Sequence, residues 1–140
     1  MGARDATRGQ PAEALGGRFV QLDVTSGASV AGTAEKVAAA GGLDVLINNA
    51  GISGPHSQAA ELTAEDALAV YGTNVVSTVR MISAFVPILR ASSAPAIVNL
   101  TRGLGSFARV HDPERIESKI NAPLYTSSKS AVTMLTMQYA

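Results

Sequence analysis

The chain has 140 residues and a mass of 14.3 kDa, a size that suits one domain with a single core. It is 46% hydrophobic and its 11 basic residues balance 11 acidic ones, so no basic field favours nucleic acid or an anionic membrane surface. Cysteine is absent and His56 and His111 are the only histidines, which excludes disulfides and thiolate nucleophiles and leads us to expect no metal site.

The N-terminal residues and the apolar stretches indicate whether the protein is secreted or crosses a membrane. Residues 1–5 lack the basic-then-apolar order of a secretory signal. The apolar stretch of residues 38–50 is shorter than the roughly 18 residues that a membrane span needs. We therefore expect a soluble, cytoplasmic protein in which residues 1–140 form one domain.

The first third of the chain predicts a strand followed by a helix. Scattered glycines and a proline limit any helix around residues 12–15 to a short one. Residues 18–24 are rich in β-forming side chains and predict a strand. Thr25 or Ser26 can cap a helix over about residues 28–40, which the Gly-Gly pair after it would end.

The next predicted strand leads directly into a polar turn. Leu43-Asp-Val-Leu-Ile47 is a short apolar run, typical of a strand that is buried on both faces. The Asn-Asn-Ala-Gly turn of residues 48–51 follows it. Its glycine permits a positive φ or the close approach of another molecule's backbone.

A long amphipathic helix is predicted in the middle of the chain. Thr63 precedes Glu65 and Asp66, which suit a first turn because the helix dipole favours negative charge there. Apolar side chains then recur at helical spacing to about Leu89, with a kink or an end expected near Pro87.

The last part of the chain predicts a third strand and a final helix. The strand covers residues 96–101, a long charged loop covers residues 102–123, and an amphipathic helix runs from about Tyr125 to Ala140. The alternation of strands and helices predicts an α/β fold, with a parallel sheet covered by helices on both faces.

The start of that final helix carries a candidate proton-transfer pair. In Tyr125-Thr-Ser-Ser-Lys129 the phenol and the ammonium share one helix face, because residues four apart are neighbours. A tyrosine with the ordinary pKa of about 10 is a poor acid or base at neutral pH. A nearby cation lowers that pKa, which would let Tyr125 exchange a proton with an alcohol or ketone oxygen.

Four landmarks stand in one order along the chain. They are Asp23-Val24 at a strand end, the turn of residues 48–51, Asn74 in the long helix, and Tyr125-x-x-x-Lys129. This order resembles the short-chain dehydrogenase/reductase family over nearly the whole chain. The resemblance implies an incomplete Rossmann-like, doubly wound parallel sheet with helices on both faces and a site at the carboxyl ends of its strands.

The resemblance also implies roles for individual residues. Tyr125 would be the general acid/base, Lys129 would lower its pKa and bind the nicotinamide ribose, and Asn74 would hold a water in a proton relay. The other residues implied to bind NADP(H) are Arg4 at the 2′-phosphate, Asp23 and Val24 at the adenine, and Asn49, Ala50 and Gly51 along the groove. Each has a structural alternative: Asn74 could bridge the helix to the backbone of a strand, the turn could only stabilise the sheet, and Arg4 could be a surface side chain.

The sequence departs from the family at the serine that holds the substrate oxygen. The family pattern Val-Asn-x-Ser-Ser is replaced by Val98-Asn-Leu-Thr-Arg102, so Arg102 stands at the serine position. Thr101 has a hydroxyl but is expected to point to the other side of the strand, because side chains alternate. Ser106 could serve only if the loop folded back. Arg102 brings a permanent cation that could bind an oxyanion or repel Lys129.

A second departure concerns the phosphate-binding turn. No G-x-G-x-x-G occurs, and the family's last strands and substrate-covering segment have no counterpart in this sequence. This reading makes the chain a domain truncated at both ends, either a fragment or a shortened relative. We expect it to hold NADP(H) weakly or not at all.

Three functional hypotheses remain open. The first is a short-chain oxidoreductase that interconverts a ketone and a secondary alcohol with NADP(H). The second is a cofactor-independent acid/base enzyme, such as a cyclase, isomerase or dehydratase, whose substrate contacts the loop of residues 103–123. The third is a non-catalytic relative that dimerises through the helices of residues 63–89 and 125–140, a homo-oligomer contact that the first two also allow.

Overall fold

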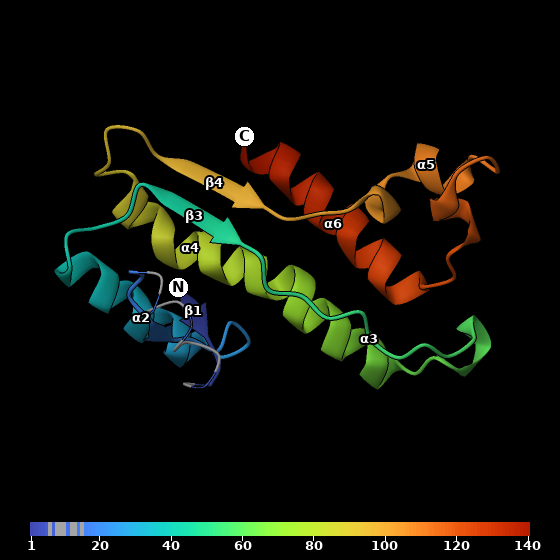
Figure 1. Cartoon of the computed structure of the whole chain (residues 1–140), viewed down its shortest axis with the longest axis horizontal. Helices are drawn as coiled ribbons and strands as arrows, with labels where there is room; N and C mark the ends of the chain where they lie inside the picture. Colours follow the sequence, from blue (N-terminus) through green and yellow to red (C-terminus); the bar gives the residue numbers. More distant parts are fainter. Residues whose placement is uncertain (6, 8–10, 12–13, 15) are drawn as a thin grey trace. The chain divides into compact units, whose positions relative to one another are not determined.

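The computed structural model describes residues 1–5, 7, 11, 14 and 16–140 (Figure 1). The short helix expected around residues 12–15 falls largely outside this described part. The chain divides into two compact units. The first unit consists of residues 1–46 and 80–97, and the second unit consists of residues 47–79 and 98–140.

The first unit begins with a small parallel sheet. Strand β1 (Gly2–Ala3) pairs with strand β2 (Val20–Gln21). The strand predicted over residues 18–24 is therefore much shorter than expected. It ends early because Asp23 Oδ1 accepts hydrogen bonds from the backbone N–H and the hydroxyl of Thr25, which turns the chain.

Helix α2 (Gly27–Ala39) follows as local sequence chemistry predicts. Ser26 caps it, because its side chain accepts a hydrogen bond from Ser29 N. Gly41 and Gly42 have φ values of 112° and 96°, and the helix has ended before them. The predicted helix over residues 28–40 is thus confirmed to within one residue at each end.

The core of the first unit is one cluster of buried apolar side chains. It joins α2, the start of strand β3 (Val45–Asn48) and the later part of helix α4 (Ser77–Leu89). Its buried members are Val30, Ala34, Leu46, Met81, Ile82, Phe85 and Leu89. Burial of these side chains is the main stabilising contribution in this unit.

Strand β3 pairs with strand β4 (Ala96–Asn99), and the two run in the same direction (Figure 1). The predicted burial of β3 on both faces is wrong. Leu46 is 6% exposed, whereas Val45 is 44% and Ile47 is 60% exposed, so the described structure covers one face only. In place of one parallel sheet, the described residues form two sheets of two strands each. The α/β class itself is confirmed.

The long helical stretch in the middle contains three parts. Thr63 caps helix α3 (Ala64–Tyr71) and shares a reciprocal capping box with Asp66, as the acidic first turn predicts. A π-helical turn, η2 (Gly72–Val76), then leads into α4, which ends two residues after Pro87. The sequence did not predict the π-helical turn.

Hydropathy alone would make this stretch a candidate membrane segment. Residues Ala64–Leu89 are long and apolar enough to cross a bilayer, and no other helix in the described part of the chain meets that test. However, Val70, Ile82 and Phe85 are 3% exposed or less. These three side chains are buried in the fold, so part of the apolar composition is that of a core helix, and 39% of the most apolar window is buried.

The segment predicted as a long loop of residues 102–123 is instead built from short helices. It contains η3 (Gly103–Gly105), α5 (Phe107–His111) and η4 (Ile116–Lys119). Helix α6 (Pro123–Tyr139) follows, with proline in its first turn, where a missing N–H costs nothing. Within the second unit, α6 packs against η3, α3 and η2, and a short turn η1 (Ala59–Glu61) precedes α3.

Candidate active site

One cavity of about 560 Å³ lies in the second unit. Its polar lining includes Tyr125 and Lys129 from α6 and Thr101 and Arg102 after β4. Four of the five predicted catalytic residues therefore meet at one cavity, and Asn74 is the exception. The remaining lining residues are Asn49, Gly51, Ile52, Ser53, His56, Leu100, Leu104, Ile120 and Ala122.

Tyr125 and Lys129 lie one helical turn apart at this cavity. Lys129 Nζ is 5.7 Å from the centroid of the Tyr125 ring. Lys129 is only 6% exposed, and its Nζ donates a hydrogen bond of 2.9 Å to the Leu100 carbonyl. The helix and this one bond fix the ammonium beside the phenol, as the spacing of the pair predicts.

The electrostatic environment of Lys129 disfavours its charge. Burial lowers the pKa of Lys129, and the neighbouring positive charge of Arg102 lowers that pKa further. Arg102 therefore lies close enough for its charge to oppose that of Lys129, one of the two roles that the sequence left open for it. The site holds two cationic groups whose charges oppose each other.

Asn74 connects the turn after β3 to helix α6. The residue is 1% exposed. Asn74 Oδ1 accepts a hydrogen bond of 2.8 Å from Ile52 N, and Asn74 Nδ2 donates hydrogen bonds of 2.9 Å to Ile52 O and to Ser128 Oγ. The Asn74 carbonyl accepts a bond from the Thr78 hydroxyl. Its position in a π-helical turn is typical of functional sites, where such turns are frequent. The predicted water-relay role remains a prediction beside this bridging role.

Gly51 lies at a close approach within the chain itself. It does not have the positive φ that its turn suggested. A Cβ atom there would lie 3.3 Å from Asn74 Oδ1 and 3.5 Å from Lys129 Nζ. Asn49 lines the cavity with Gly51, whereas Ala50 between them is exposed and does not.

The first asparagine of the turn has a structural partner. Asn48 Nδ2 donates to Asn99 Oδ1 (2.8 Å), and Asn99 Nδ2 donates in turn to Thr136 Oγ1 (2.9 Å). This chain of side-chain bonds links β3, β4 and α6. It supports the alternative in which part of the turn stabilises the sheet.

The hydroxyl groups near the expected serine position are already engaged. Thr101 Oγ1 lies 3.0 Å from Thr133 Oγ1 and 3.3 Å from the Lys129 carbonyl, although Thr101 also lines the cavity. Ser106 caps α5 by accepting a bond from Arg109 N and does not line the cavity. Arg102 is the side chain that occupies the expected serine position at the cavity.

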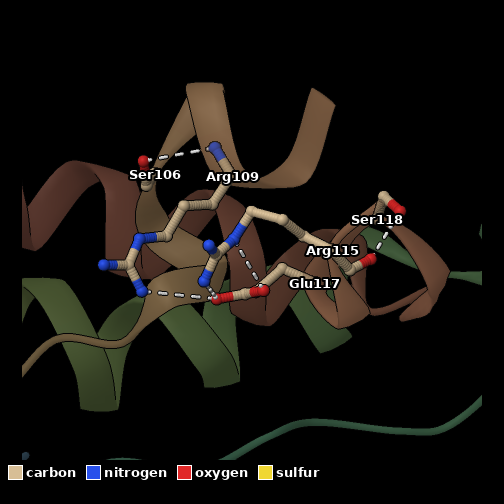
Figure 2. A network of polar contacts seen from close by, with 5 residues as sticks. All are labelled: Ser106, Arg109, Arg115, Glu117 and Ser118. Carbon is tan, nitrogen blue, oxygen red and sulfur yellow. Dashed lines mark hydrogen bonds and ion pairs between the residues drawn. The ribbon is translucent and has the colours of Figure 1, made fainter. Parts of the chain in front are cut away.

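A polar cluster stabilises the segment that follows Arg102 (Figure 2). Glu117, on η4, accepts bonds from Arg115 Nε (3.2 Å) and Nη2 (3.1 Å) and from Arg109 Nη1 (3.4 Å). These bonds, those to Arg115 first, hold the pKa of Glu117 below its usual range. A side chain on Gly103 would collide with the Glu117 carboxylate, so the cluster sits directly against η3.

The residues predicted at the adenine end belong to the first unit. Arg4 directly follows β1, and its carbonyl accepts a bond from Gln21 Nε2. The bonds from Thr25 lower the pKa of Asp23, and the Val24 carbonyl accepts a 2.7 Å bond from Arg80 Nη1. Their roles toward a nucleotide remain predictions.

Sequence reasoning missed the apolar and polar residues that complete the cavity. Ser53 and His56 follow the turn of residues 48–51 closely, and this nearness was the one available signal. Leu104 and Ile120 come from the segment read as a loop. Ser128, which joins Asn74 to α6, gave no signal beyond its place beside Lys129.

Comparison with known proteins gives consistent results. A family model described as short chain dehydrogenase matches residues 4–140. A short-chain dehydrogenase of Penicillium roqueforti is 43% identical over 99 residues, which is 68% of this chain and 39% of that protein. A short-chain dehydrogenase/reductase of Aspergillus fumigatus is 37% identical over 146 residues, which is 96% of this chain and 54% of that protein.

Solved structures give the same match. The NADPH-bound carbonyl reductase from chicken fatty liver has a TM-score of 0.85 and 31% identity, covering 96% of this chain and 58% of that chain. This likeness confirms the Rossmann-like α/β class. The chain spans about half or less of the length of the two fungal relatives.

Proposed function

The chain belongs to the short-chain dehydrogenase/reductase family, and on that premise we propose that it serves as an oxidoreductase interconverting a ketone and a secondary alcohol with NADP(H). The observation that carries the proposal is the cavity where Tyr125 and Lys129 meet Asn49 and Gly51. Its volume of about 560 Å³ is in the range of small-molecule sites in proteins. The chicken carbonyl reductase, which is similar in fold, is described as NADPH-bound.

The residues around the cavity fit the nicotinamide-ribose end of NADP(H). Lys129 Nζ donates to Leu100 O, and an ammonium has three N–H groups, so donors remain for ribose hydroxyls. Gly51 keeps the wall beside Lys129 open, because any Cβ there would fill the space next to Nζ. When bound, NADP(H) would supply or accept the hydride at the substrate carbon.

Tyr125 is the proposed acid/base. Its hydroxyl would give a proton to the carbonyl oxygen as the hydride reaches the carbonyl carbon, and in the reverse direction it would take the alcohol proton. Lys129, 5.7 Å from the ring centroid, would stabilise the phenolate that remains. The nearby Thr101 hydroxyl is engaged with Thr133, so Tyr125 is the group proposed to meet the reacting oxygen.

The first test of this proposal is nucleotide binding. The sequence contains no tryptophan, so the fluorescence of NADPH can be titrated against a low protein background. Because no G-x-G-x-x-G turn occurs in the sequence, the proposal predicts weak binding: an enhancement that saturates only at high NADPH concentration, with slow NADPH oxidation when a ketone is present. Tyr125→Phe should retain the enhancement and lose the oxidation, whereas Tyr139→Phe, at the exposed end of α6, should retain both. Equal oxidation by Tyr125→Phe and the native chain would refute the role of the phenol.

A second candidate function is acid/base catalysis without a nucleotide. It is favoured by the replacement of the family's serine with Arg102, a cation that could stabilise an enolate. Tyr125 and Lys129 would then move a proton in a cyclisation, isomerisation or dehydration. Turnover that needs Tyr125 but proceeds without added nucleotide would favour this function over hydride transfer.

Homo-oligomerisation is proposed through α3 and α6. Leu68 is 73%, Met134 57% and Met137 68% exposed, so these helices offer large apolar side chains to a partner. Sedimentation should show a dimer that Met137→Glu weakens, and a monomer at every concentration would refute the contact. Under this proposal the partners are a small-molecule substrate and a second copy of the chain, in the cytoplasm.

A further inference from the structure

The cavity of the second unit has an unbalanced charge. Two of its lining residues, Arg102 and Lys129, are cationic groups, and His56 adds an imidazole. No aspartate or glutamate is among its lining residues. A concave site lined by one sign of charge attracts ligands of the opposite sign.

The acid of the neighbouring segment does not neutralise Arg102. Glu117 is engaged by Arg115 and Arg109, which meet its two carboxylate oxygens (Figure 2). Among the residues that the structure describes, none accepts a hydrogen bond or ion pair from the Arg102 side chain. The guanidinium of Arg102 therefore keeps its donors for a ligand.

Lys129, the second cationic residue of the cavity, also favours the binding of an anionic ligand. Lys129 is buried, and Arg102 opposes its charge, so the pKa of Lys129 is lowered. An anionic group bound beside Arg102 would offset this repulsion. Binding of such a group should therefore be coupled to proton uptake by the protein at pH values above the lowered pKa.

The residues that line the cavity indicate which class of ligand it can bind. The planar fork of an arginine matches a carboxylate through two parallel hydrogen bonds. Ile52, Leu104 and Ile120 supply apolar surface for a hydrocarbon body. We infer that the substrate is a carbonyl compound bearing a carboxylate, which Arg102 anchors while Tyr125 faces the carbonyl oxygen. This inference deepens the proposed function and rests on it for the identity of the reacting group.

The test compares two aryl ketones that differ only in charge. The probes are 4-acetylbenzoate and its neutral analogue 4-acetylbenzamide, titrated by calorimetry without any nucleotide. The native chain should bind the carboxylate about fivefold more tightly, since Arg102 is solvent-exposed and exposed charge pairs contribute modestly. The preference should fall when the salt concentration is raised.

Matched variants assign the preference to Arg102. Arg102→Leu should abolish it, Arg102→Lys should retain part of it, and Arg90→Leu, an exposed arginine of the first unit, should leave it unchanged. Each variant is first shown to be folded by circular dichroism. If Arg102→Leu does not fold, the salt dependence of the native chain decides: a preference for the carboxylate that high salt does not reduce overturns the inference.

Three further results would overturn the inference. They are equal binding of the two probes by the native chain, an unchanged preference in folded Arg102→Leu, and loss of NADPH binding rather than probe binding in that variant. The two proposals fail separately. NADPH-dependent reduction of the two ketones without a carboxylate preference sinks only the substrate class. A carboxylate preference without any reduction sinks the proposed function and the carbonyl as reacting group, and leaves Arg102 as a carboxylate anchor.

Discussion

Replacement of Asn74 tests the polar bridge that positions the cavity. Its side chain makes bonds of 2.8 and 2.9 Å to the backbone of Ile52 and 2.9 Å to Ser128 Oγ, and it is 1% exposed. Each such bond contributes about 1 kcal/mol net, and an orphaned buried partner costs more. Ile52 is 37% exposed, so water can replace part of what Asn74→Ala removes. We therefore expect Asn74→Ala to lower the free energy of unfolding by about 3 kcal/mol.

Urea denaturation followed by circular dichroism measures this loss. The matched control is Asn121→Ala, since Asn121 is exposed and lies outside any helix or strand, and its free energy of unfolding should change by less than about 0.5 kcal/mol. A loss under about 1 kcal/mol in Asn74→Ala would refute the reasoning. It would mean that the bridge between the turn after β3 and α6 contributes little to the fold.

Three further predictions follow from single contacts. The pKa of Lys129 is lowered in the folded chain, so between that pKa and 10.5 the unfolded chain binds more protons than the folded chain. The free energy of unfolding should therefore rise with pH in this range, and Lys129→Met should flatten the rise in urea titrations at several pH values. Gly54→Ala should lower the free energy of unfolding by about 2 kcal/mol, because φ at Gly54 is +76° and the added Cβ would lie 2.6 Å from Val70 Cγ2. Thr63→Ala removes the side chain that caps α3 and should lower the free energy of unfolding by about 1 kcal/mol, whereas Thr63→Ser keeps the hydroxyl and should change that free energy little.

Each of these predictions has a clear contradiction. An unchanged pH slope in Lys129→Met would show that another group titrates in that range. A melting temperature of Gly54→Ala equal to that of the native chain would show that the turn relaxes without strain. Equal stability of Thr63→Ala and Thr63→Ser would show that the capping bond is replaced by water.

Local chemistry made much of the helical structure predictable. The ends of α2 follow from Ser26 and the Gly-Gly pair, and the start of α3 follows from Thr63 and Asp66, because these residues satisfy or end the backbone bonds of their own helix. The pair Tyr125 and Lys129 was predictable for the same reason, since four-residue spacing on one helix fixes their neighbourhood.

Features that depend on distant partners were not predictable. The burial of β3 on one face depends on what covers it, which an apolar run of residues does not specify. Within residues 102–123, Glu117 accepts bonds from Arg115, two residues away, and from Arg109 on α5, eight residues away, and the second contact forms only once the segment has folded back on itself. Leu68 fits the apolar period of its helix, yet it is 73% exposed while Val70 is fully buried. Because residues two apart lie on different faces of a helix, tertiary packing and not the apolar period decided which face is covered here.

The most direct test of the proposed function follows the hydride itself. The purified chain would be incubated with NADPH deuterated at the reacting carbon and with 4-acetylbenzoate and 4-acetylbenzamide as ketones. We predict that the product alcohol carries deuterium at its carbinol carbon and that Tyr125→Phe forms almost none. No deuterated alcohol from folded, NADPH-binding protein would contradict hydride transfer by this chain.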